Sequence, residues 1–95
     1  MKLIVAPAAL ADLERLHAFL SDKSPTAAQR AIVALERAME SLDIFPDRGR
    51  PSGVAGVREL IVPFGRSAYV IRYAHRQQTN EVIVLRIWHG RENRD

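Results

Sequence analysis

The C-terminal run Arg86-Ile87-Trp88-His89-Gly90-Arg91 gathers the residue types of this chain that are best suited to chemistry. A histidine beside arginines can cleave RNA by general acid–base catalysis. One group removes the 2′-hydroxyl proton, another protonates the leaving oxygen, and cations stabilise the phosphorane. One histidine and several arginines are nevertheless common in basic proteins. The pattern makes His89 a candidate catalytic residue without establishing an enzyme.

The same run carries a tryptophan that is suited to binding. In a strand, alternation places Arg86 and Trp88 on one face and Ile87 and His89 on the other. An indole beside guanidinium groups can stack a nucleobase or anchor a protein interface, or it can cap the edge of the core. The sequence leaves both roles of Trp88 open.

Metal and cofactor motifs are missing from the sequence. The chain has no cysteine, which removes disulfides, thiolate zinc sites and cysteine nucleophiles. The three histidines are far apart in the sequence and have no flanking carboxylate at a known ligand spacing. The glycines do not join a strand to a helix as a phosphate-binding loop does. We therefore expect no metal and no cofactor.

Basic residues outnumber acidic ones, and most of them are arginine. The 95 residues include 14 lysines and arginines and 11 aspartates and glutamates, which gives a net charge of +3. Between residues 58 and 94 there are seven arginines and three glutamates. The planar guanidinium group suits phosphate and carboxylate partners. This basic half indicates nucleic acid or an acidic protein as partner, although a solvated, arginine-rich sheet edge has the same composition.

Hydrophobic periodicity predicts a short strand and then two helices. Residues 2–6 are rich in strand formers. Leucines recur every three or four positions over residues 8–23, which is typical of an amphipathic helix. Ser24 and Pro25 supply a cap and a first residue for a second helix that runs to about Asp43. Alanines along the second helix allow the two helices to pack closely as an antiparallel hairpin.

Three strands follow a long break in the pattern. Prolines and glycines in residues 44–53 exclude regular structure. Runs of β-branched and aromatic residues predict strands at 57–62, 67–73 and 81–88, and their short connections require antiparallel pairing. The last strand is apolar on both faces, so we expect it to be central and covered on both sides.

The predicted fold class is α+β with the element order β-α-α-β-β-β. A helical hairpin packs on one face of a small, mainly antiparallel sheet, and the other face either binds a partner or stays partly exposed. Residues 1–95 have the length of one domain. Asp12 and Glu14 interrupt the apolar N-terminal run, so we expect no signal peptide, no membrane contact and a cytoplasmic location.

Several short motifs, in their order and spacing, resemble the RelE/ParE toxin superfamily of type II toxin–antitoxin systems along almost the whole chain. These motifs are Ala8-Ala9-Leu10-Ala11-Asp12-Leu13, Ser24-Pro25-Thr26-Ala27-Ala28, Leu42 with Pro46, Gly49-Arg50-Pro51, Gly56-Val57-Arg58-Glu59-Leu60, Tyr69-Val70-Ile71-Arg72-Tyr73 and Leu85-Arg86-Ile87-Trp88-His89-Gly90-Arg91. The resemblance implies one toxin domain that inhibits growth and takes part in plasmid stabilization.

The superfamily contains two kinds of toxin. RelE-like members cleave mRNA in the ribosomal A site, whereas ParE-like members poison DNA gyrase. A RelE-like enzyme carries a strand-three arginine where this sequence has Val70, and its terminal tyrosine has no counterpart in Asn93-Arg94-Asp95. The Arg58-Glu59 pair and the His-Gly-Arg ending are more similar to the ParE branch. The resemblance therefore implies a gyrase inhibitor that is not an enzyme.

Two alternatives stay open beside the gyrase inhibitor. A ribosome-dependent mRNA endonuclease would use His89, Arg72, Arg86 and Arg91 in acid–base and phosphate-binding roles. A degenerate toxin would serve only as a structural partner of its antitoxin.

Either branch implies a cognate antitoxin and a hetero-oligomeric complex with it. Such antitoxins lay a helical or extended tail over the toxin. We expect this contact on the basic, partly apolar sheet face and in the groove beside the helical hairpin. The candidate residues for binding the target or partner are Arg58, Glu59, Arg66, Tyr69, Arg72, Arg86, Trp88, His89 and Arg91.

Overall fold

A computed structural model describes residues 1–92 of the chain as two helices and five strands. These elements are β1 (Lys2–Val5), α1 (Pro7–Lys23), α2 (Pro25–Ser41), β2 (Arg50–Pro51), β3 (Val57–Phe64), β4 (Ser67–Arg76) and β5 (Glu81–His89). Residues 93–95 lie outside the described residues, and with them the position compared with a terminal tyrosine and the basic Arg94.

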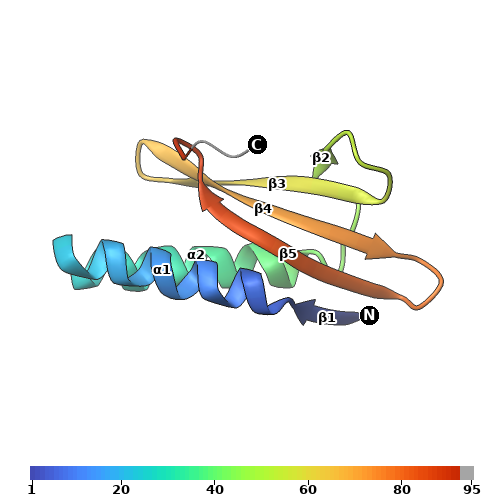
Figure 1. Ribbon diagram of the computed structural model, residues 1–95, viewed down its shortest axis with the longest axis horizontal. Coiled ribbons are helices and arrows are strands. Elements are labelled where there is room, and N and C mark those ends of the chain that lie inside the picture. The colour runs from blue at the N-terminus through green and yellow to red at the C-terminus, as the bar shows by residue number, and fades with distance from the viewer. Residues whose placement is uncertain (93–95) are drawn as a thin grey trace.

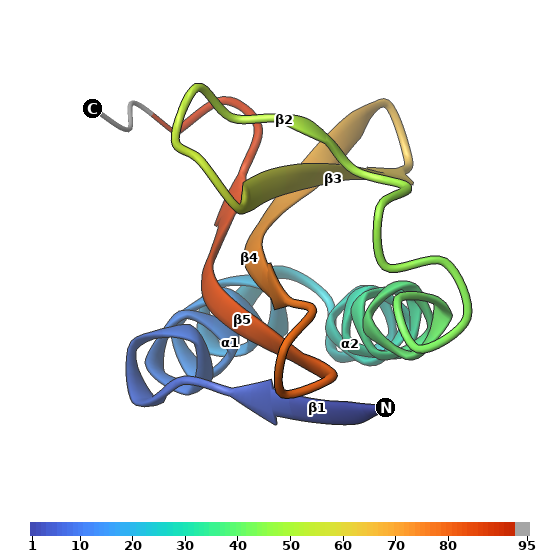
Figure 2. The ribbon, with the colours of Figure 1, turned by 90° about the vertical axis from the view of Figure 1, so that its right-hand side faces the viewer.

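Both helices lie on the same face of one twisted sheet, as Figure 1 shows. The strand order is β1-β5-β4-β3-β2, with β1 parallel to β5 and every other neighbouring pair antiparallel. The end-on view in Figure 2 places α1 beside β5 and α2 on the side of β3, in agreement with their contacts. The α+β class and the helical hairpin on one sheet face are therefore confirmed.

The connection between the helices forms as the sequence predicts. The Ser24 side chain accepts a hydrogen bond from the Ala27 N–H at 3.1 Å, and Pro25 is the first residue of α2. This bond satisfies a backbone donor that the first turn of a helix leaves open. The helix ends at Ser41, two residues before the predicted Asp43, because the chain turns there and the Leu42 N–H bonds back to Met39 and Glu40 carbonyls.

The prediction that residues 44–53 exclude regular structure is wrong for two of them. Arg50 and Pro51 form the short strand β2, which pairs with Glu59 and Arg58 of β3. Proline is tolerated there because β2 is the edge strand of the sheet and needs no N–H on its outer side. The sheet therefore has five strands where the sequence predicts four.

Tyr73 fixes the connection that leads into β2. Its buried hydroxyl donates to the Pro46 carbonyl at 2.7 Å and accepts from the Gly49 N–H at 3.0 Å. Gly49 passes so close that a Cβ there would lie 2.8 Å from the Tyr73 ring. Burial raises the pKa of Tyr73 above its ordinary value, so the hydroxyl stays protonated and keeps its donor.

A β-bulge in β5 changes which way its later side chains point. The register with β4 shifts between Arg72 and Tyr73, where β5 has Leu85 as an extra residue. Beyond the bulge, Arg86 pairs with Arg72 and Trp88 pairs with Val70, so the expectation that Arg86 and Trp88 share a face is confirmed. The Arg86 side chain bonds to α1, whereas Trp88 lies against the guanidinium of Arg72.

The core fills the space between the helices and the sheet. Its buried members are Ala9, Leu16, Ala31, Leu35, Met39, Leu42, Leu60, Val62, Tyr69, Ile71, Tyr73, Val82, Val84 and Ile87. β5 lies between β1 and β4 as predicted, but Ile83 and Leu85 are only half-buried. The expectation that β5 is covered on both sides is wrong, because a chain this short supplies one helical layer and no second one.

Candidate functional site

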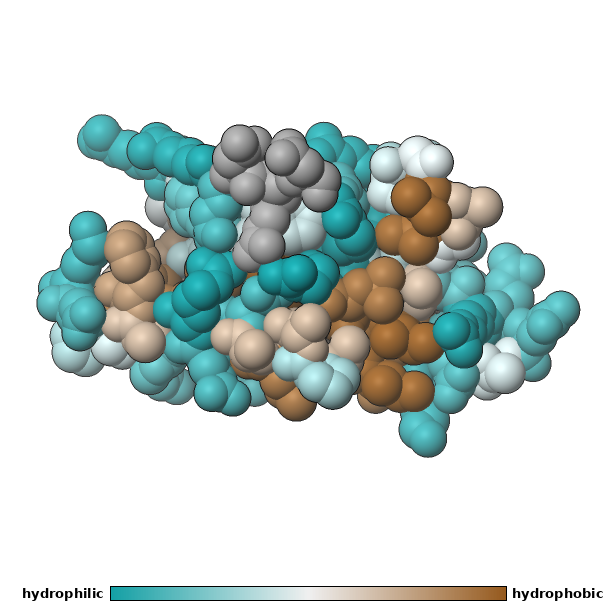
Figure 3. Space-filling model, in the orientation of Figure 1, coloured by the Kyte–Doolittle hydropathy of each residue, from teal (hydrophilic) through white to brown (hydrophobic). Residues whose placement is uncertain are grey.

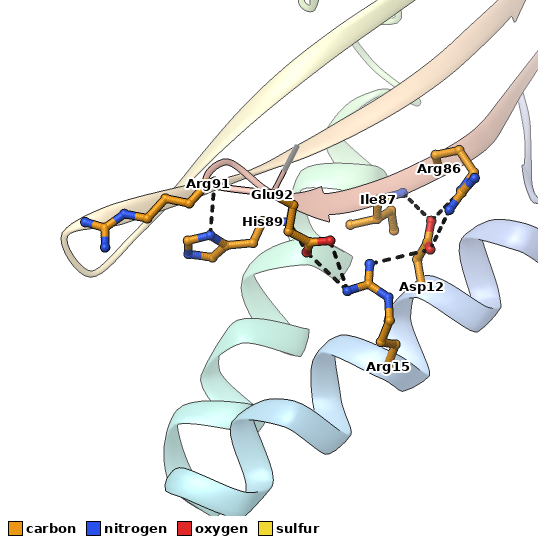
Figure 4. A network of polar contacts seen from close by, with 7 residues as sticks. All are labelled: Asp12, Arg15, Arg86, Ile87, His89, Arg91 and Glu92. Carbon is orange, nitrogen blue, oxygen red and sulfur yellow. Dashed lines mark hydrogen bonds and ion pairs between the residues drawn. The ribbon is translucent and has the colours of Figure 1, made fainter. Parts of the chain in front are cut away.

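Asp12 of α1 is buried and joins the helix to β5, as Figure 4 shows. Its Oδ2 accepts from Arg86 Nε and from the Ile87 N–H, both at 2.8 Å, and its Oδ1 accepts from Arg86 Nη2 at 3.1 Å. Burial raises the pKa of Asp12, but the hydrogen bonds from Arg86 and Ile87 and the charges of Arg86 and Arg15 outweigh it and lower the pKa below its ordinary value. The carboxylate is therefore ionised inside the fold.

The length of β1 explains why β5 needs this carboxylate. The parallel pairing stops at Val5 and Val84, and Ala6 donates one more backbone hydrogen bond to the Val84 carbonyl at 2.9 Å. Farther along β5, no strand formed by residues 1–92 pairs on that side, and the Ile87 N–H donates to Asp12 instead. A buried backbone donor without an acceptor would be costly, so Asp12 takes the place of the missing strand.

The chain turns at residues 89–92, directly after β5, and α1 contacts this turn. The Glu92 N–H donates to the His89 carbonyl at 2.8 Å, and Glu92 Oε1 accepts from the His89 N–H at 2.9 Å. Arg15 lies 3.1 Å from Glu92 and 3.6 Å from Asp12. One arginine of α1 therefore links the buried carboxylate to the turn (Figure 4).

The His89 ring has a defined orientation and tautomer. Its Nδ1 accepts from the Arg91 N–H at 3.1 Å, so the proton of the neutral ring is on Nε2. The ring lies edge-on to Tyr69, with centroids 5.5 Å apart. A general base needs an open imidazole lone pair, and Nδ1 is already engaged. The geometry favours the Nε2–H as a hydrogen-bond donor.

An apolar groove of about 610 Å³ lies between α1 and the end of the sheet. Its lining residues are Arg15, Leu16, Phe19, Leu20, Phe64, Tyr69, His89, Arg91 and Glu92. Phe19 is 59% exposed, and Figure 3 shows an apolar patch at the left, over the end of α1. Burial and the nearby Glu92 raise the pKa of Tyr69, which keeps its hydroxyl neutral. Apolar walls with charged groups at the mouth suit an amphipathic helix.

A second charged cluster lies on the sheet face away from the helices. Glu59 Oε2 accepts from Arg72 Nε at 3.1 Å and from Arg72 Nη2 at 2.8 Å, and Arg50 lies 3.4 Å from the same carboxylate. The Arg72 guanidinium stacks over the Trp88 ring at 4.8 Å. Trp88 is only 7% exposed, so its indole packs against the sheet beneath an arginine.

Arg58 and Arg66 lie outside both clusters. Arg58 Nη1 donates to the Gly49 carbonyl at 2.8 Å, and its Nε lies 3.6 Å from Asp47. Arg58 therefore holds the connection between α2 and β3. Arg66 is exposed in the turn between β3 and β4.

The structure brings only some of the candidate residues together. Tyr69, His89 and Arg91 line the groove. The guanidinium groups of Arg72 and Arg86 bind different carboxylates, Glu59 and Asp12, although the two arginines are register partners in β4 and β5. The four residues named for a nuclease are therefore divided between the groove and two separate ion pairs.

Sequence reasoning missed Asp12, Arg15 and Glu92 as parts of the site. A signal existed for Asp12, which lies three residues after Ala9 and four before Leu16, on the buried side of α1. No local pattern predicts the contact between Arg15 and Glu92, because 77 residues separate them.

Within residues 1–92, no group of three histidine, aspartate or glutamate side chains is placed to hold a metal ion. In the same part of the chain, neither helix combines the length and the apolar character that a membrane span requires.

Comparison with known proteins identifies relatives along nearly the whole chain. A model of the ParE toxin of the type II toxin–antitoxin system parDE matches residues 3–94. Toxin RelE1 of Caulobacter vibrioides is 46% identical over 91 residues, which covers 96% of this chain and 95% of that toxin. Toxin RelE3 of the same organism is 37% identical over 90 residues and covers 95% of each chain.

A solved structure has the same fold. It is described as the chromosomal ParDE TA system from P. aeruginosa, and its matching chain has a TM-score of 0.77 and 26% identity. The match covers 94% of this chain and 95% of that one. The order of the elements, the helical hairpin on the sheet and the family match agree, and the chain belongs to the ParE toxin family, whose members are toxins of type II toxin–antitoxin systems.

Proposed function

We propose that this toxin inhibits DNA gyrase by binding to it, without catalysing a reaction, and that a cognate antitoxin neutralises it. The observation that carries the proposal is the engagement of Arg72 and Arg86 in separate ion pairs with Glu59 and Asp12. RNA cleavage needs cations and an acid–base pair around one phosphate group. Two of the four candidate nuclease residues instead stabilise the fold.

The groove end of the molecule is the surface that we assign to the target. Arg91 is exposed at the mouth of the groove, beside His89. The Gly90 N–H donates to the Ala68 carbonyl at 2.7 Å, which holds the turn after β5 next to the β3–β4 turn with its exposed Arg66. Exposed arginines near an apolar surface are typical of protein interfaces.

The groove itself is the surface that we assign to the antitoxin. A helix with large apolar side chains on one face fits the walls formed by Leu16, Phe19 and Phe64, and a carboxylate on its edge would meet Arg91. The resemblance to a chain of a solved ParDE system supports an antitoxin partner. Binding at the groove would cover the surface assigned to gyrase.

A supercoiling assay with purified toxin and gyrase tests the target. We expect inhibition that rises with the ratio of toxin to gyrase, and its loss when antitoxin is added first. Phe64, His89 and Arg91 line the assigned surface, whereas Arg37 is exposed on α2 outside it. An Arg91→Ala variant should inhibit less than the matched control Arg37→Ala.

The names of two relatives, RelE1 and RelE3, call for a second arm of this experiment. Primer extension on mRNA translated in the presence of the toxin reports ribosome-dependent cleavage. Unchanged supercoiling together with new mRNA ends that disappear in His89→Ala would replace the gyrase proposal with an endonuclease. Unchanged supercoiling, intact mRNA and normal growth would indicate a toxin without activity.

A further inference from the structure

We propose that Arg15 is a positioning residue: through Glu92 it fixes the turn at residues 89–92, and thereby places His89 and Arg91 at the mouth of the groove. The inference rests on the proposed function, because it assigns these two side chains to target binding. Arg15 itself belongs to α1 and is not part of the turn that it holds.

Arg15 is anchored to the buried carboxylate of Asp12. Its Nη2 lies 3.6 Å from Asp12, one helical turn before it, and its Nη1 donates to Glu92 Oε1 at 3.2 Å. Asp12 is held in turn by Arg86 and by the Ile87 N–H. The guanidinium group of Arg15 therefore holds the partly exposed carboxylate of Glu92 in place relative to the buried carboxylate of Asp12.

Glu92 does two things with one carboxylate. It binds Arg15, and it accepts the His89 N–H at 2.9 Å. His89 comes two residues after Ile87, so both N–H groups point to the same edge of β5, beyond the end of β1. The two donors on this edge are met by two carboxylates, and Arg15 lies between those carboxylates (Figure 4).

The ion pair also belongs to the groove. Arg15, Glu92, His89 and Arg91 all line it. The side chains of Arg15 and Glu92 are 44% and 30% exposed, so their pairing adds little to the stability of the whole fold. A variant that breaks the pair should therefore stay folded while the turn loosens, which separates positioning from a general structural role.

Hydrogen exchange at two backbone amides tests the positioning directly. We expect the His89 amide to exchange about fivefold faster in Arg15→Gln than in the wild type, and the Ile87 amide to be unchanged because Asp12 still accepts it. Glu92→Gln should have the same effect as Arg15→Gln. The double variant should be no worse than either single one, because all three lack the same ion pair.

Function supplies the second readout. Arg15→Gln should weaken gyrase inhibition and growth arrest on expression, and Arg15→Lys, which keeps the charge, should recover part of both. Arg37→Gln, an exposed arginine of α2 outside the groove, is the matched control. Additive effects of Arg15→Gln and Glu92→Gln in the double variant would overturn the proposal.

The proposed gyrase target and the positioning role of Arg15 can fail separately. If the wild-type toxin leaves gyrase untouched, the proposed target is wrong, while the exchange rates and the growth arrest still decide the role of Arg15. Equal His89 exchange in wild type and Arg15→Gln overturns the positioning role whatever the target. Faster exchange with unchanged inhibition and unchanged growth arrest also overturns it, because the turn would then not place residues that matter.

Discussion

Two arginine–carboxylate pairs stabilise the sheet, and they differ in what they join. Asp12 and Arg86 are 74 positions apart and connect α1 to β5. Glu59 and Arg72 are direct register partners on β3 and β4, which backbone hydrogen bonds already join. The Asp12 carboxylate also accepts the Ile87 N–H, whereas Glu59 also pairs with a second, exposed arginine, Arg50.

This difference explains why the loss of Asp12 and the loss of Glu59 affect the fold differently. Without Asp12, a backbone donor of β5 loses its acceptor and α1 loses its polar attachment to the sheet. Without Glu59, two strands lose one cross-strand pair and keep their backbone ladder. Asp12 also lies next to Arg15 and hence to the turn at residues 89–92, so its effects extend to the groove.

The largest expected effect is therefore that of Asp12→Ala. It leaves the Ile87 N–H without its side-chain acceptor, and we expect the free energy of unfolding to fall by about 2 kcal/mol. Urea denaturation followed by circular dichroism measures this change. A loss no greater than that of Glu59→Ala would remove the distinction between the two pairs.

Glu59→Ala should cost less, about 1 kcal/mol, because the paired strands stay hydrogen-bonded and Arg72 can turn toward solvent. The same denaturation experiment measures it. Tryptophan fluorescence adds a specific readout, since Arg72 covers the ring of Trp88 and should move when its carboxylate is removed. An unchanged emission spectrum would mean that Glu59 does not hold Arg72 in place.

The pH dependence of stability should follow Asp12. Its pKa is lower in the folded protein than its ordinary value of 3.8, so the unfolded chain takes up the proton first as the pH falls. The stabilisation is complete above that ordinary value and is lost as the pH falls through the folded pKa. Asp12→Asn should flatten this acid limb of the unfolding free energy, and Glu59→Gln should retain it. Parallel acid limbs in wild type and Asp12→Asn would contradict the assignment.

The smallest effect on stability should come from Phe19→Ala, which touches neither pair. Phe19 is 59% exposed, so its truncation should change the unfolding free energy by less than about 0.5 kcal/mol. The affinity of the Phe19→Ala toxin for the antitoxin should nevertheless fall, because Phe19 lines the groove assigned to that partner. Isothermal titration with the antitoxin measures this, with the exposed α2 variant Arg37→Ala as control. Equal affinities would place the antitoxin elsewhere.

The sequence predicts the parts of this fold that depend on local patterns. The leucine spacing of α1, the Ser24 cap and the short turns between the last strands are local signals, and the structure has all of them. The two-residue strand β2 gave no such signal. It forms because Tyr73 of β4 and Arg58 of β3 hold the preceding connection.

The candidate site was less predictable for a related reason. Alternation correctly assigns Arg86 and Trp88 to one face of β5, but no local pattern predicts that the Arg86 side chain binds Asp12, 74 positions away on α1. Arg72 and Arg86, which look available for phosphate in the sequence, are bound by the carboxylates of Glu59 and Asp12. Whether an arginine is open to a ligand depends on those tertiary contacts.

Direct binding is the measurement that tests the central claim most closely, namely that this toxin acts by occupying gyrase. Purified toxin should bind gyrase saturably at physiological salt, antitoxin should compete, and Arg91→Ala should bind more weakly than Arg37→Ala. Under the same conditions, the toxin should leave the mRNA on translating ribosomes intact. No binding to gyrase, together with cleavage of mRNA on the ribosome at substoichiometric toxin, would contradict the claim.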